Sequence, residues 1–396
     1  MLLKADPNGA VSSSEILGRE AEAERLWTTL TQRSAILEGR VGIGKTTVIR
    51  KAFASPPAGW SGRLVALGEL DNPLAAAAAL IDAAWDQHPE PGPALRALVE
   101  PLLGTEGRVT ADAVGMGDGE HEDSWDALLR DCIDTLMQEA EGTGEGEGVV
   151  LALEDFDGFC ARVMAKGFGP SLGVLVAVLG ELCEMHPRLR LLVSCNTSCE
   201  RLFERVYPRL PAQPIDGFAR LRIEALSPES SARLVSALLL GESITARDRA
   251  ATARKIAVAF DGVPRWIHCA MAEFVRRRRP IVDGDVEAMV ESAAKVLEGE
   301  PWQLRRELAP VLDDYWEPQR GLALAVLDML AGAEDGALEF RALRQQLAIE
   351  MTIDDDAIRR VVVELGRDQL VEEFGGQLRF CGELLRRAWA VSRGLA

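Results

Sequence analysis

Residues 39–46 read Gly39-Arg40-Val41-Gly42-Ile43-Gly44-Lys45-Thr46. They match the pattern G-x-x-x-x-G-K-[ST], and they stand between a predicted strand, Ala35 to Leu37, and a predicted helix, Thr46 to Ala54. In such a loop, glycines let backbone N–H groups curl around phosphates, and the start of the following helix adds its positive dipole end. We therefore predict a phosphate-binding loop in which Lys45 reaches the β- and γ-phosphates and Thr46 holds Mg²⁺.

An acidic group after a second strand fits this prediction. Val149 to Leu153 is the clearest buried strand of the chain, and Glu154-Asp155-Phe156-Asp157 follows it. A phosphate loop needs an acidic residue on a neighbouring strand to hold Mg²⁺ through water. We predict that Glu154 takes the metal position and that Asp155 orients the attacking water. The usual order is Asp followed by Glu or Asp, so the roles of Glu154, Asp155 and Asp157 stay open, and a strand that merely ends in a polar turn is the alternative.

Strands and helices alternate around the loop. The predicted strands are 35–37, 63–67, 149–153, 189–194 and 221–226, and the predicted helices are 15–32, 46–54, 74–85, 124–139 and 172–185. This alternation predicts a parallel α/β sheet with flanking helices. The stretches 88–123 and 141–148, rich in Gly and acidic residues, are interpreted as surface insertions. After residue 226 the pattern is mostly helical, beginning with a helix start at Ser227-Pro228-Glu229.

The pattern of the last 79 residues predicts a winged helix. This fold consists of three helices followed by a β-hairpin. The helices are 322–330, 340–347 and 354–366, two short strands meet at Gly375-Gly376, and a final helix runs from 382 to about 391. Outward-facing arginines are candidates for phosphate contacts, namely Arg359, Arg360, Arg367 and Arg379. Two features argue against DNA binding. Three acidic residues, Asp354, Asp355 and Asp356, lie at the start of the third helix, and residues 318–396 contain 13 acidic but only 10 basic residues. DNA contact and a protein-docking or autoinhibitory role both stay open, and the second is favoured.

Composition narrows the class of protein. The chain has 396 residues and a formal net charge of −18, and only six of its 44 basic residues are lysine. This length fits two or three domains, and 47% apolar residues are enough for sizeable cores. So negative a chain repels nucleic acid on average, which disfavours a simple, wholly basic DNA-coating protein.

The N-terminus and the cysteines indicate where the protein works. Residues 1–7 lack the apolar core of a secretory signal, and no apolar run reaches the roughly 18 residues that span a bilayer. We therefore expect a cytoplasmic protein without a membrane partner. Seven scattered cysteines without a CxxC pair suit a reducing compartment better than a disulfide framework. The close pair Cys195 and Cys199 is interpreted as ordinary buried thiols, and we predict no zinc.

With these motifs in order, the chain resembles the AAA+ and STAND class of P-loop ATPases, most closely the initiator-like and archaeal-type ATPases that continue into a helical lid and a winged helix. Ile16 to Glu20 looks like the hydrophobic-Gly-Arg-Glu box that packs around adenine. Asn196 follows the strand after the acidic one, where this class carries its first sensor. Phe260 to Arg265 looks like the Gly-x-Pro lid motif, with Arg265 near the second-sensor arginine. The resemblance covers about residues 14–300.

The resemblance implies ATP or ADP with Mg²⁺ as ligands, and it implies three sets of site residues. The nucleotide-binding set is Leu17, Gly18, Arg19, Gly39, Val41, Gly42, Ile43, Gly44, Lys45, Thr46, Thr47 and Pro264. Thr46 and Glu154 are the implied Mg²⁺ ligands, partly through water. The implied catalytic residues are Asp155, Asn196 and Arg265. Arg201, Arg205 and Arg209 are candidates for the arginine that AAA+ rings supply from a neighbouring subunit.

The resemblance also implies an organisation and a function. The expected parts are an N-terminal tail (1–14), an α/β P-loop ATPase core (15–226), a helical lid (227–300), a linker (301–317) and a winged-helix domain (318–396). We expect an ATPase that acts as a nucleotide-dependent switch, positioning the winged helix for a protein or DNA partner, with self-association as a further possibility. The alternatives are an ATP-dependent DNA-binding initiator or transposition-type loader, and a scaffold with a structural nucleotide. The run Arg276 to Arg279 is either a solvated helix end or a site for phosphate or an acidic partner.

Overall fold

The computed structural model describes residues 3–6, 12, 15–86, 91–115, 124–142, 148–196, 198–199, 217–296, 302, 304, 308, 315, 318–350 and 354–395. Its internal contacts divide the chain into two compact units. The first, here called the sheet unit, consists of Glu20–Glu38 and Lys45–Arg222. The second, here called the helical unit, consists of Met1–Arg19, Gly39–Gly44 and Ile223–Ala396. The phosphate loop therefore packs with the helical unit, while the strand before it and the helix after it belong to the sheet unit.

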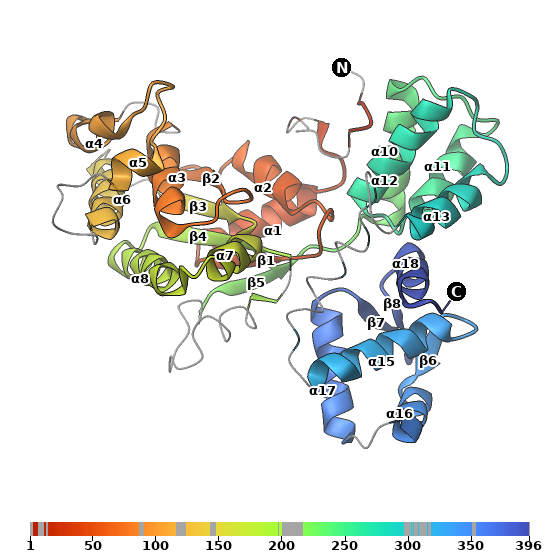
Figure 1. Ribbon diagram of the computed structural model, residues 1–396. Helices are drawn as coiled ribbons and strands as arrows, with labels where there is room; N and C mark the ends of the chain where they lie inside the picture. The colour runs from red at the N-terminus through yellow and green to blue at the C-terminus, as the bar shows by residue number, and fades with distance from the viewer. Residues whose placement is uncertain are drawn as a thin grey trace. The chain divides into compact units, whose positions relative to one another are not determined.

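The sheet unit contains a five-stranded sheet with the order β2-β3-β4-β1-β5 (Figure 1). The strands are β1 (Ala35–Glu38), β2 (Trp60–Ala66), β3 (Gly148–Glu154), β4 (Leu189–Cys195) and β5 (Ala219–Arg222). Every neighbouring pair is parallel, which confirms the predicted α/β sheet. All carboxyl ends of a parallel sheet lie at one edge, so the residues that follow β3 and β4 are brought together there with the start of α2.

Helices cover the sheet, and together with the sheet they form the hydrophobic core of the sheet unit. They are α1 (Glu20–Leu30), α2 (Lys45–Phe53), α3 (Pro73–Asp86), α6 (Ser124–Gly142), α7 (Phe156–Ala165) and α8 (Gly169–Met185). The side chains of Val149 to Leu153 are all buried, as expected for a central parallel strand with helices on both faces. One continuous core joins this strand to α3, α6, α7 and α8. Helix α7 was not predicted, because its short apolar pattern directly follows the acidic group.

The prediction of a surface insertion over 88–123 is wrong for the part that the structure describes. This part holds α4 (Pro93–Val99), a 3-10 turn η2 (Glu100–Leu102) and α5 (Ala111–Gly115). Leu95, Val99 and Val114 are buried in the core of the sheet unit. Leu95 and Val99 are four residues apart and so share one face of α4, and this pair outweighs the local excess of Gly and Pro. In the second predicted insertion, residues 143–147 lie outside the described residues.

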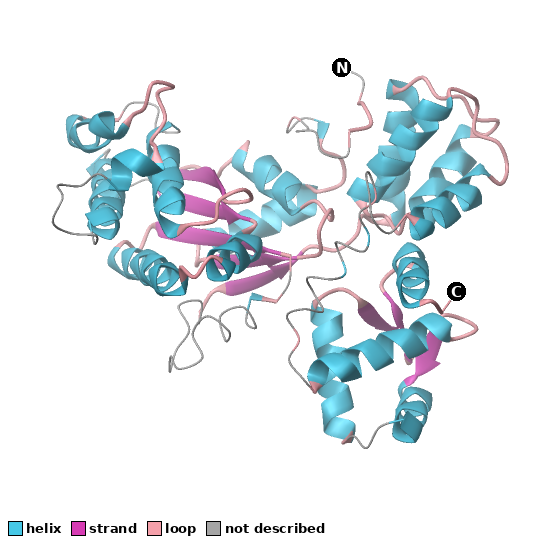
Figure 2. Cartoon of the chain, in the orientation of Figure 1, coloured by secondary structure: helices cyan, strands magenta, loops and turns pink. Residues whose placement is uncertain are grey.

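Over residues 228–295 of the helical unit the structure describes four helices, namely α10 (Pro228–Gly241), α11 (Arg249–Ala259), α12 (Pro264–Arg277) and α13 (Asp285–Lys295) (Figure 2). The predicted start of α10 is confirmed, since the Ser227 hydroxyl accepts a hydrogen bond from the Ser230 N–H at 3.1 Å. The strand predicted over 221–226 is shorter than expected and ends at Arg222. The residues after it lead directly into α10.

The C-terminal segment, residues 318–395, also belongs to the helical unit. Its elements are α15 (Gln319–Gly332), β6 (Ala337–Glu339), α16 (Phe340–Glu350), α17 (Asp355–Arg367), β7 (Val371–Phe374), β8 (Gln377–Phe380) and α18 (Glu383–Arg393). The predicted helices and hairpin are present, and Gly375 and Gly376 both take the positive φ that the tight hairpin needs. Strand β6, which was not predicted, adds a third antiparallel strand in the order β6-β8-β7.

None of the helices in the described ranges combines the length and the apolar character that crossing a bilayer requires.

Candidate nucleotide-binding site

Four of the predicted site residues meet at the carboxyl edge of the sheet. Lys45 opens α2, is only 8% exposed, and its Nζ donates to Asn196 Oδ1 at 2.8 Å. The hydroxyl of Thr46 donates to the carboxylate of Glu154 at the end of β3. The parallel order explains this meeting, because α2 follows β1 and Asn196 follows β4. Thr47 is the next residue of α2 and is half-buried.

Asp155 lies in the same group and has a fixed position. It takes a left-handed backbone conformation with φ 57°, directly before α7. Its Oδ1 accepts a hydrogen bond from Asn196 Nδ2 at 2.8 Å. Its Oδ2 lies 3.3 Å from Arg162 Nη1 in an ion pair. The carboxylate is therefore held between an amide and a guanidinium, and aspartate is among the residues that tolerate this backbone conformation best.

Arg162 is a site residue that the sequence analysis missed. It lies two turns into α7, and its guanidinium also donates to the carbonyl oxygens of Leu67 and Leu70 at 2.8 and 2.9 Å. These bonds fix the guanidinium beside Asp155. The sequence does show a basic residue seven positions after Asp155. This spacing predicts a contact between the two side chains only if residues 156–165 are known to form a helix.

Asp157 has a different role from its two acidic neighbours. It is buried, and its carboxylate accepts the backbone N–H of Asn196 at 2.8 Å. This bond holds the segment after β4 against the start of α7. Of the three acidic residues, Glu154 therefore contacts Thr46, Asp155 contacts the Asn196 side chain, and Asp157 chiefly anchors backbone.

The phosphate loop itself depends on glycine at Gly42 and Gly44, whose φ values are 74° and 100°. A side chain at Gly42 would place its Cβ 2.8 Å from the Cβ of Arg265. The backbone N–H of Arg265 donates to the Gly42 carbonyl at 3.3 Å, and Pro264 occupies the first turn of α12. The predicted lid motif therefore lies directly against the loop within the helical unit.

The hydrophobic-Gly-Arg-Glu box packs against the same loop. Arg19 is 2% exposed, and its guanidinium donates to the carbonyl oxygens of Ile43 at 2.7 Å and Glu224 at 3.0 Å. Gly18 has φ 70°, and a Cβ there would lie 2.5 Å from the Cβ of Ser230. Leu17 is half-buried. Arg19 therefore stabilises the backbone of the loop through its bond to the Ile43 carbonyl.

We expect Arg19→Met to destabilise the chain by about 2–4 kcal/mol, because the buried carbonyl oxygen of Ile43 and the partly buried one of Glu224 lose their donor, at about 1–3 kcal/mol for a buried group. Urea unfolding of the variant and of wild type measures the difference. Arg25→Met is the matched control, since the Arg25 guanidinium donates to the carbonyl of Arg222 at an exposed position. An equal loss of stability in both variants contradicts the supporting role of Arg19.

Asp261, in the predicted lid motif, caps the last helix of the chain. Its carboxylate accepts the backbone N–H groups of Glu383 at 3.0 Å and Leu384 at 3.2 Å, at the start of α18. Burial raises the pKa of Asp261 to about 6, the nearby guanidinium of Arg40 lowers this pKa, and the charge of Glu383 raises it. The lid motif therefore touches both the phosphate loop and the C-terminal segment.

This raised pKa predicts a pH dependence of stability. The folded protein holds the Asp261 proton more tightly than the unfolded chain, so the contribution of this group to stability is fully present below pH about 4 and is lost as the pH rises through 6. We expect the slope of Tm against pH between 4 and 6 to be less negative in Asp261→Asn than in wild type. Asp248→Asn, which alters an exposed cap of α11, is the control and should leave the slope unchanged. Identical slopes in Asp261→Asn and wild type contradict the prediction.

The interpretation of Cys195 and Cys199 as free thiols is wrong. The structure joins them in a disulfide, with the two Cα atoms 6.3 Å apart. Cys195 ends β4 and the chain bends at Asn196, and the two cysteines lie within the usual reach of a disulfide. Sequence spacing alone did not reveal this bend.

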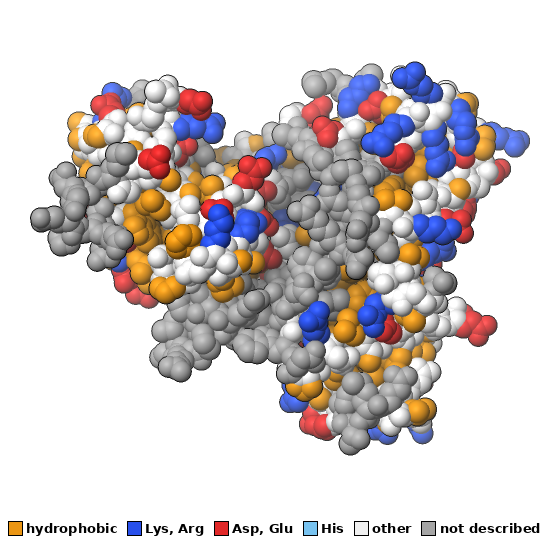
Figure 3. Space-filling model, in the orientation of Figure 1, with side chains coloured by type: hydrophobic (Ala, Val, Ile, Leu, Met, Phe, Trp, Pro, Cys, Tyr) orange, Lys and Arg blue, Asp and Glu red, His pale blue; other side chains and the backbone are white. Residues whose placement is uncertain are grey.

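The arginines that the sequence suggested for phosphate or partner contacts, in 276–279 and in the C-terminal segment, are largely paired within the chain. In the run Arg276 to Arg279 at the end of α12, Arg276 pairs with Glu273, and Arg279 pairs with Asp285 at 2.6 Å. In the C-terminal segment, Arg359 lies over the ring of Phe340, Arg367 pairs with Glu364, and Arg379 pairs with Glu372. Figure 3 shows that basic side chains gather over α10 to α13. Arg201, Arg205 and Arg209 lie outside the described residues.

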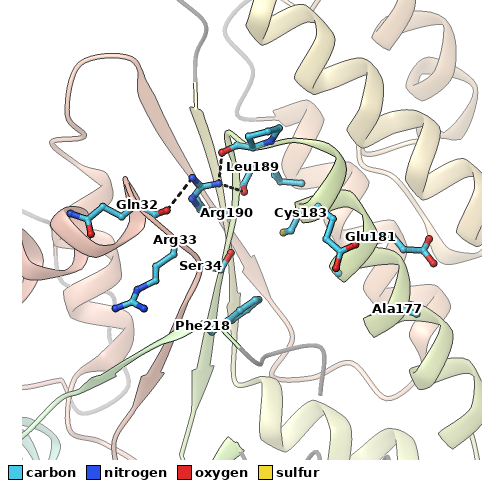
Figure 4. A pocket seen from close by; sticks show the side chains of 13 residues that line it. Gln32, Arg33, Ser34, Ala177, Glu181, Cys183, Leu189, Arg190 and Phe218 are labelled. Atoms are coloured by element: carbon cyan, nitrogen blue, oxygen red, sulfur yellow. Dashed lines mark hydrogen bonds between the residues drawn. The ribbon is translucent and has the colours of Figure 1, made fainter. Parts of the chain in front are cut away.

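A cavity of about 790 Å³ lies at the opposite edge of the sheet (Figure 4). Its lining includes Arg33, Ser34, Glu181, Cys183 and Arg190, around the amino ends of β1 and β4. The Arg190 guanidinium is engaged with backbone carbonyl oxygens, and the Ser34 hydroxyl accepts the N–H of Leu191. This cavity therefore has no part in the group formed by Lys45 and its neighbours.

No protein-family model matches the chain, and no curated protein matches it in sequence. Its structure is similar to the Walker-type ATPase of Pyrococcus abyssi, with a TM-score of 0.60 and 15% identity over 97% of this chain and 99% of that chain. It is also similar to the ORC2 protein of Aeropyrum pernix in its ADPNP–ADP complexes, with a TM-score of 0.57 and 15% identity over 99% of this chain and 96% of that chain. Identities this low compare folds alone. The chain therefore shares the fold of these two proteins, and its core is the parallel α/β P-loop sheet with flanking helices that the sequence predicted.

Proposed function

We propose that the chain binds ATP and Mg²⁺ and hydrolyses the nucleotide. The observation that carries this proposal is the meeting of Lys45, Thr46, Glu154, Asp155 and Asn196 at the carboxyl edge of the sheet. A lysine, a hydroxyl, two carboxylates and an amide are the groups that phosphoryl transfer uses. Residues 39–46 supply backbone N–H groups for the phosphates, and Lys45 supplies the positive charge.

The donor set at this edge fits a magnesium ion. Thr46 and Glu154 present a hydroxyl and a carboxylate in direct contact, and Mg²⁺ prefers such oxygen ligands. When bound there, Mg²⁺ neutralises charge on the phosphates. Thr46 and Glu154 would hold the ion, partly through water.

Asp155 and Asn196 take the roles of orienting groups in this proposal. Asp155 is fixed by Arg162 and by the amide of Asn196, so its carboxylate has a defined direction from which to accept a hydrogen bond from the attacking water. Asn196 also touches Lys45, so it connects the group that binds phosphate with the group that orients water. Arg265 lies against the phosphate loop and is the candidate for sensing the nucleotide from the lid.

We further propose that the nucleotide acts as a switch on residues 318–396, which we interpret as a winged helix. The lid motif supports this, because it contacts the loop through Arg265 and the C-terminal segment through Asp261. A change at the loop therefore has a short physical path to α18. We favour a protein partner over DNA, because the basic side chains of the winged helix are largely paired and acidic residues outnumber them.

Binding of labelled ATP, followed by release of phosphate, tests the proposal. Saturable binding that requires Mg²⁺ for full strength supports it, and a chain that binds no ATP rejects it. Binding without phosphate release above background favours a structural nucleotide. An ATP-dependent shift of duplex DNA at low salt, lost steeply as salt rises, favours the DNA-loader alternative.

A further inference from the structure

Gln369 occupies an unusual place at the end of α17. Its backbone has φ 57°, a left-handed conformation that costs most side-chain-bearing residues free energy and that glycine adopts readily. Two hydrogen bonds close the helix around it, from Gln369 N–H to the Gly366 carbonyl at 3.1 Å and from Leu370 N–H to the Leu365 carbonyl at 2.9 Å. Helices commonly end this way with glycine at that position. A strained residue of this kind points to a use for its side chain.

The side chain of Gln369 bonds to the phosphate loop and to the segment behind it. It is 5% exposed, and its Nε2 donates to the Ile223 carbonyl at 2.7 Å. Its Oε1 accepts from the backbone N–H of Arg40, the second residue of the loop, at a longer 3.4 Å. These two bonds allow only one orientation of the amide, since the reverse orientation would oppose donor to donor and acceptor to acceptor.

The neighbours of this amide hold it in place from both sides. The Asp368 carboxylate, which precedes it, is 2% exposed and accepts the hydroxyl of Tyr315 at 2.7 Å. The Arg40 guanidinium lies 4.8 Å from the ring centroid of Trp266 on α12. A side chain on Gly39 would place its Cβ 3.0 Å from the Ile223 carbonyl, so the start of the loop and Ile223 are in close contact. The backbone of Arg40 is thus held by the C-terminal segment and its side chain by α12.

We propose that Gln369 is a positioning residue for the phosphate loop and that it couples nucleotide binding to the C-terminal segment. This inference rests on the proposed function, since it concerns the same nucleotide. A loop whose start is already fixed loses less conformational freedom when it binds phosphate. By thermodynamic linkage, a nucleotide that prefers the fixed loop also strengthens the attachment of the C-terminal segment. Gln369 is the direct connection between the two.

The experiment replaces Gln369 in the full chain by glycine, which relieves the left-handed strain while removing the amide. We expect Gln369→Gly to fold with a Tm within about 3 °C of wild type, because relief of strain offsets the lost bonds. We also expect its affinity for ADP and ATP to fall by about 3- to 10-fold, the worth of one or two hydrogen bonds. Gln369→Asn, which tolerates the backbone conformation but has a shorter side chain, should behave alike.

Hydrogen exchange distinguishes the positioning role of Gln369 from a merely structural role, because a structural role alone would not change how nucleotide affects exchange in α18 and β7. In wild type, nucleotide should slow the exchange of backbone amides in α18 and β7, and in Gln369→Gly this slowing should disappear. Gln377→Ala, at an exposed glutamine of β8 in the same segment, is the matched control and should retain it. Without nucleotide, the amides of residues 39–44 should exchange about tenfold faster in Gln369→Gly than in wild type.

Two kinds of failure are distinguishable. If wild type binds ATP and Lys45→Ala does not, but Gln369→Gly has wild-type affinity and wild-type slowing in α18, the positioning role is overturned and the proposed function stands. If wild type binds no nucleotide, the proposed function falls. In that case unchanged exchange of residues 39–44 in nucleotide-free Gln369→Gly overturns the positioning role as well, and faster exchange supports it.

Discussion

Lys45→Ala is expected to weaken ATP binding by at least about 100-fold. Lys45 is the charged group of the phosphate loop, and its Nζ already lies 2.8 Å from Asn196 in a site with little exposure to water. Hydrogen bonds between an ammonium group and phosphate oxygens contribute about 1.5–3 kcal/mol each, and two of them account for this loss. Equilibrium binding of a fluorescent ATP analogue measures it.

Lys51→Ala is the matched control for this prediction. Lys51 is on the same helix, α2, and its ammonium group pairs with Glu20 at 2.9 Å. A surface pair of this kind contributes about 0–1 kcal/mol, so we expect wild-type ATP affinity. Retained binding in Lys45→Ala, or an equal loss in both variants, removes Lys45 from the proposed site and rejects the phosphate-loop function with it.

Asp155→Asn is expected to lower the rate of ATP hydrolysis by about 100- to 1000-fold while ATP affinity stays within about threefold of wild type. The amide keeps the shape of the carboxylate and its contact with Asn196, but it is a far weaker acceptor for a proton of the attacking water. The contribution of a positioned general base is about 10²–10⁴-fold. Single-turnover phosphate release and equilibrium binding, measured on the same sample, separate the two effects.

The control for Asp155 is Asp131→Asn, which changes an exposed aspartate of α6 in the same unit. It should leave both hydrolysis and binding unchanged. If Asp155→Asn hydrolyses ATP at the wild-type rate, Asp155 is not the residue that orients the water. Loss of binding in Asp155→Asn, without any effect on bound-state turnover, would assign it to nucleotide binding instead.

Local patterns were sufficient to predict much of the fold. The phosphate loop, the five strands and the helices α2, α3, α6 and α8 were predicted, because each carries its signal within a short stretch. Val149 to Leu153, for example, is a continuous apolar run, and such a run is typical of a strand buried on both faces. The helix start at Ser227 was predicted from three residues alone.

The errors arose where a local pattern competes with distant packing. The stretch 88–123 looks solvated by composition, yet Leu95 and Val99 contribute to the core of the sheet unit. Cys195 and Cys199 looked like unrelated thiols until the bend after β4 brought them together. In both cases the residues that come into contact are determined by the path of the chain after a strand. The residues nearby in sequence do not predict that path.

The sequence by itself determined which residue types the candidate site contains, and those of the phosphate loop and of the acidic group after β3 are the types that phosphates and Mg²⁺ require. Only the tertiary structure decided which side chains hold those groups in place. Arg162 reaches Asp155 across two turns of α7, whereas Arg19 and Gln369 reach the backbone of the loop from distant parts of the chain. The physical reason is that a ligand-binding motif is written in consecutive residues, whereas a hydrogen bond that positions it depends on where the fold brings a donor and an acceptor within about 3 Å.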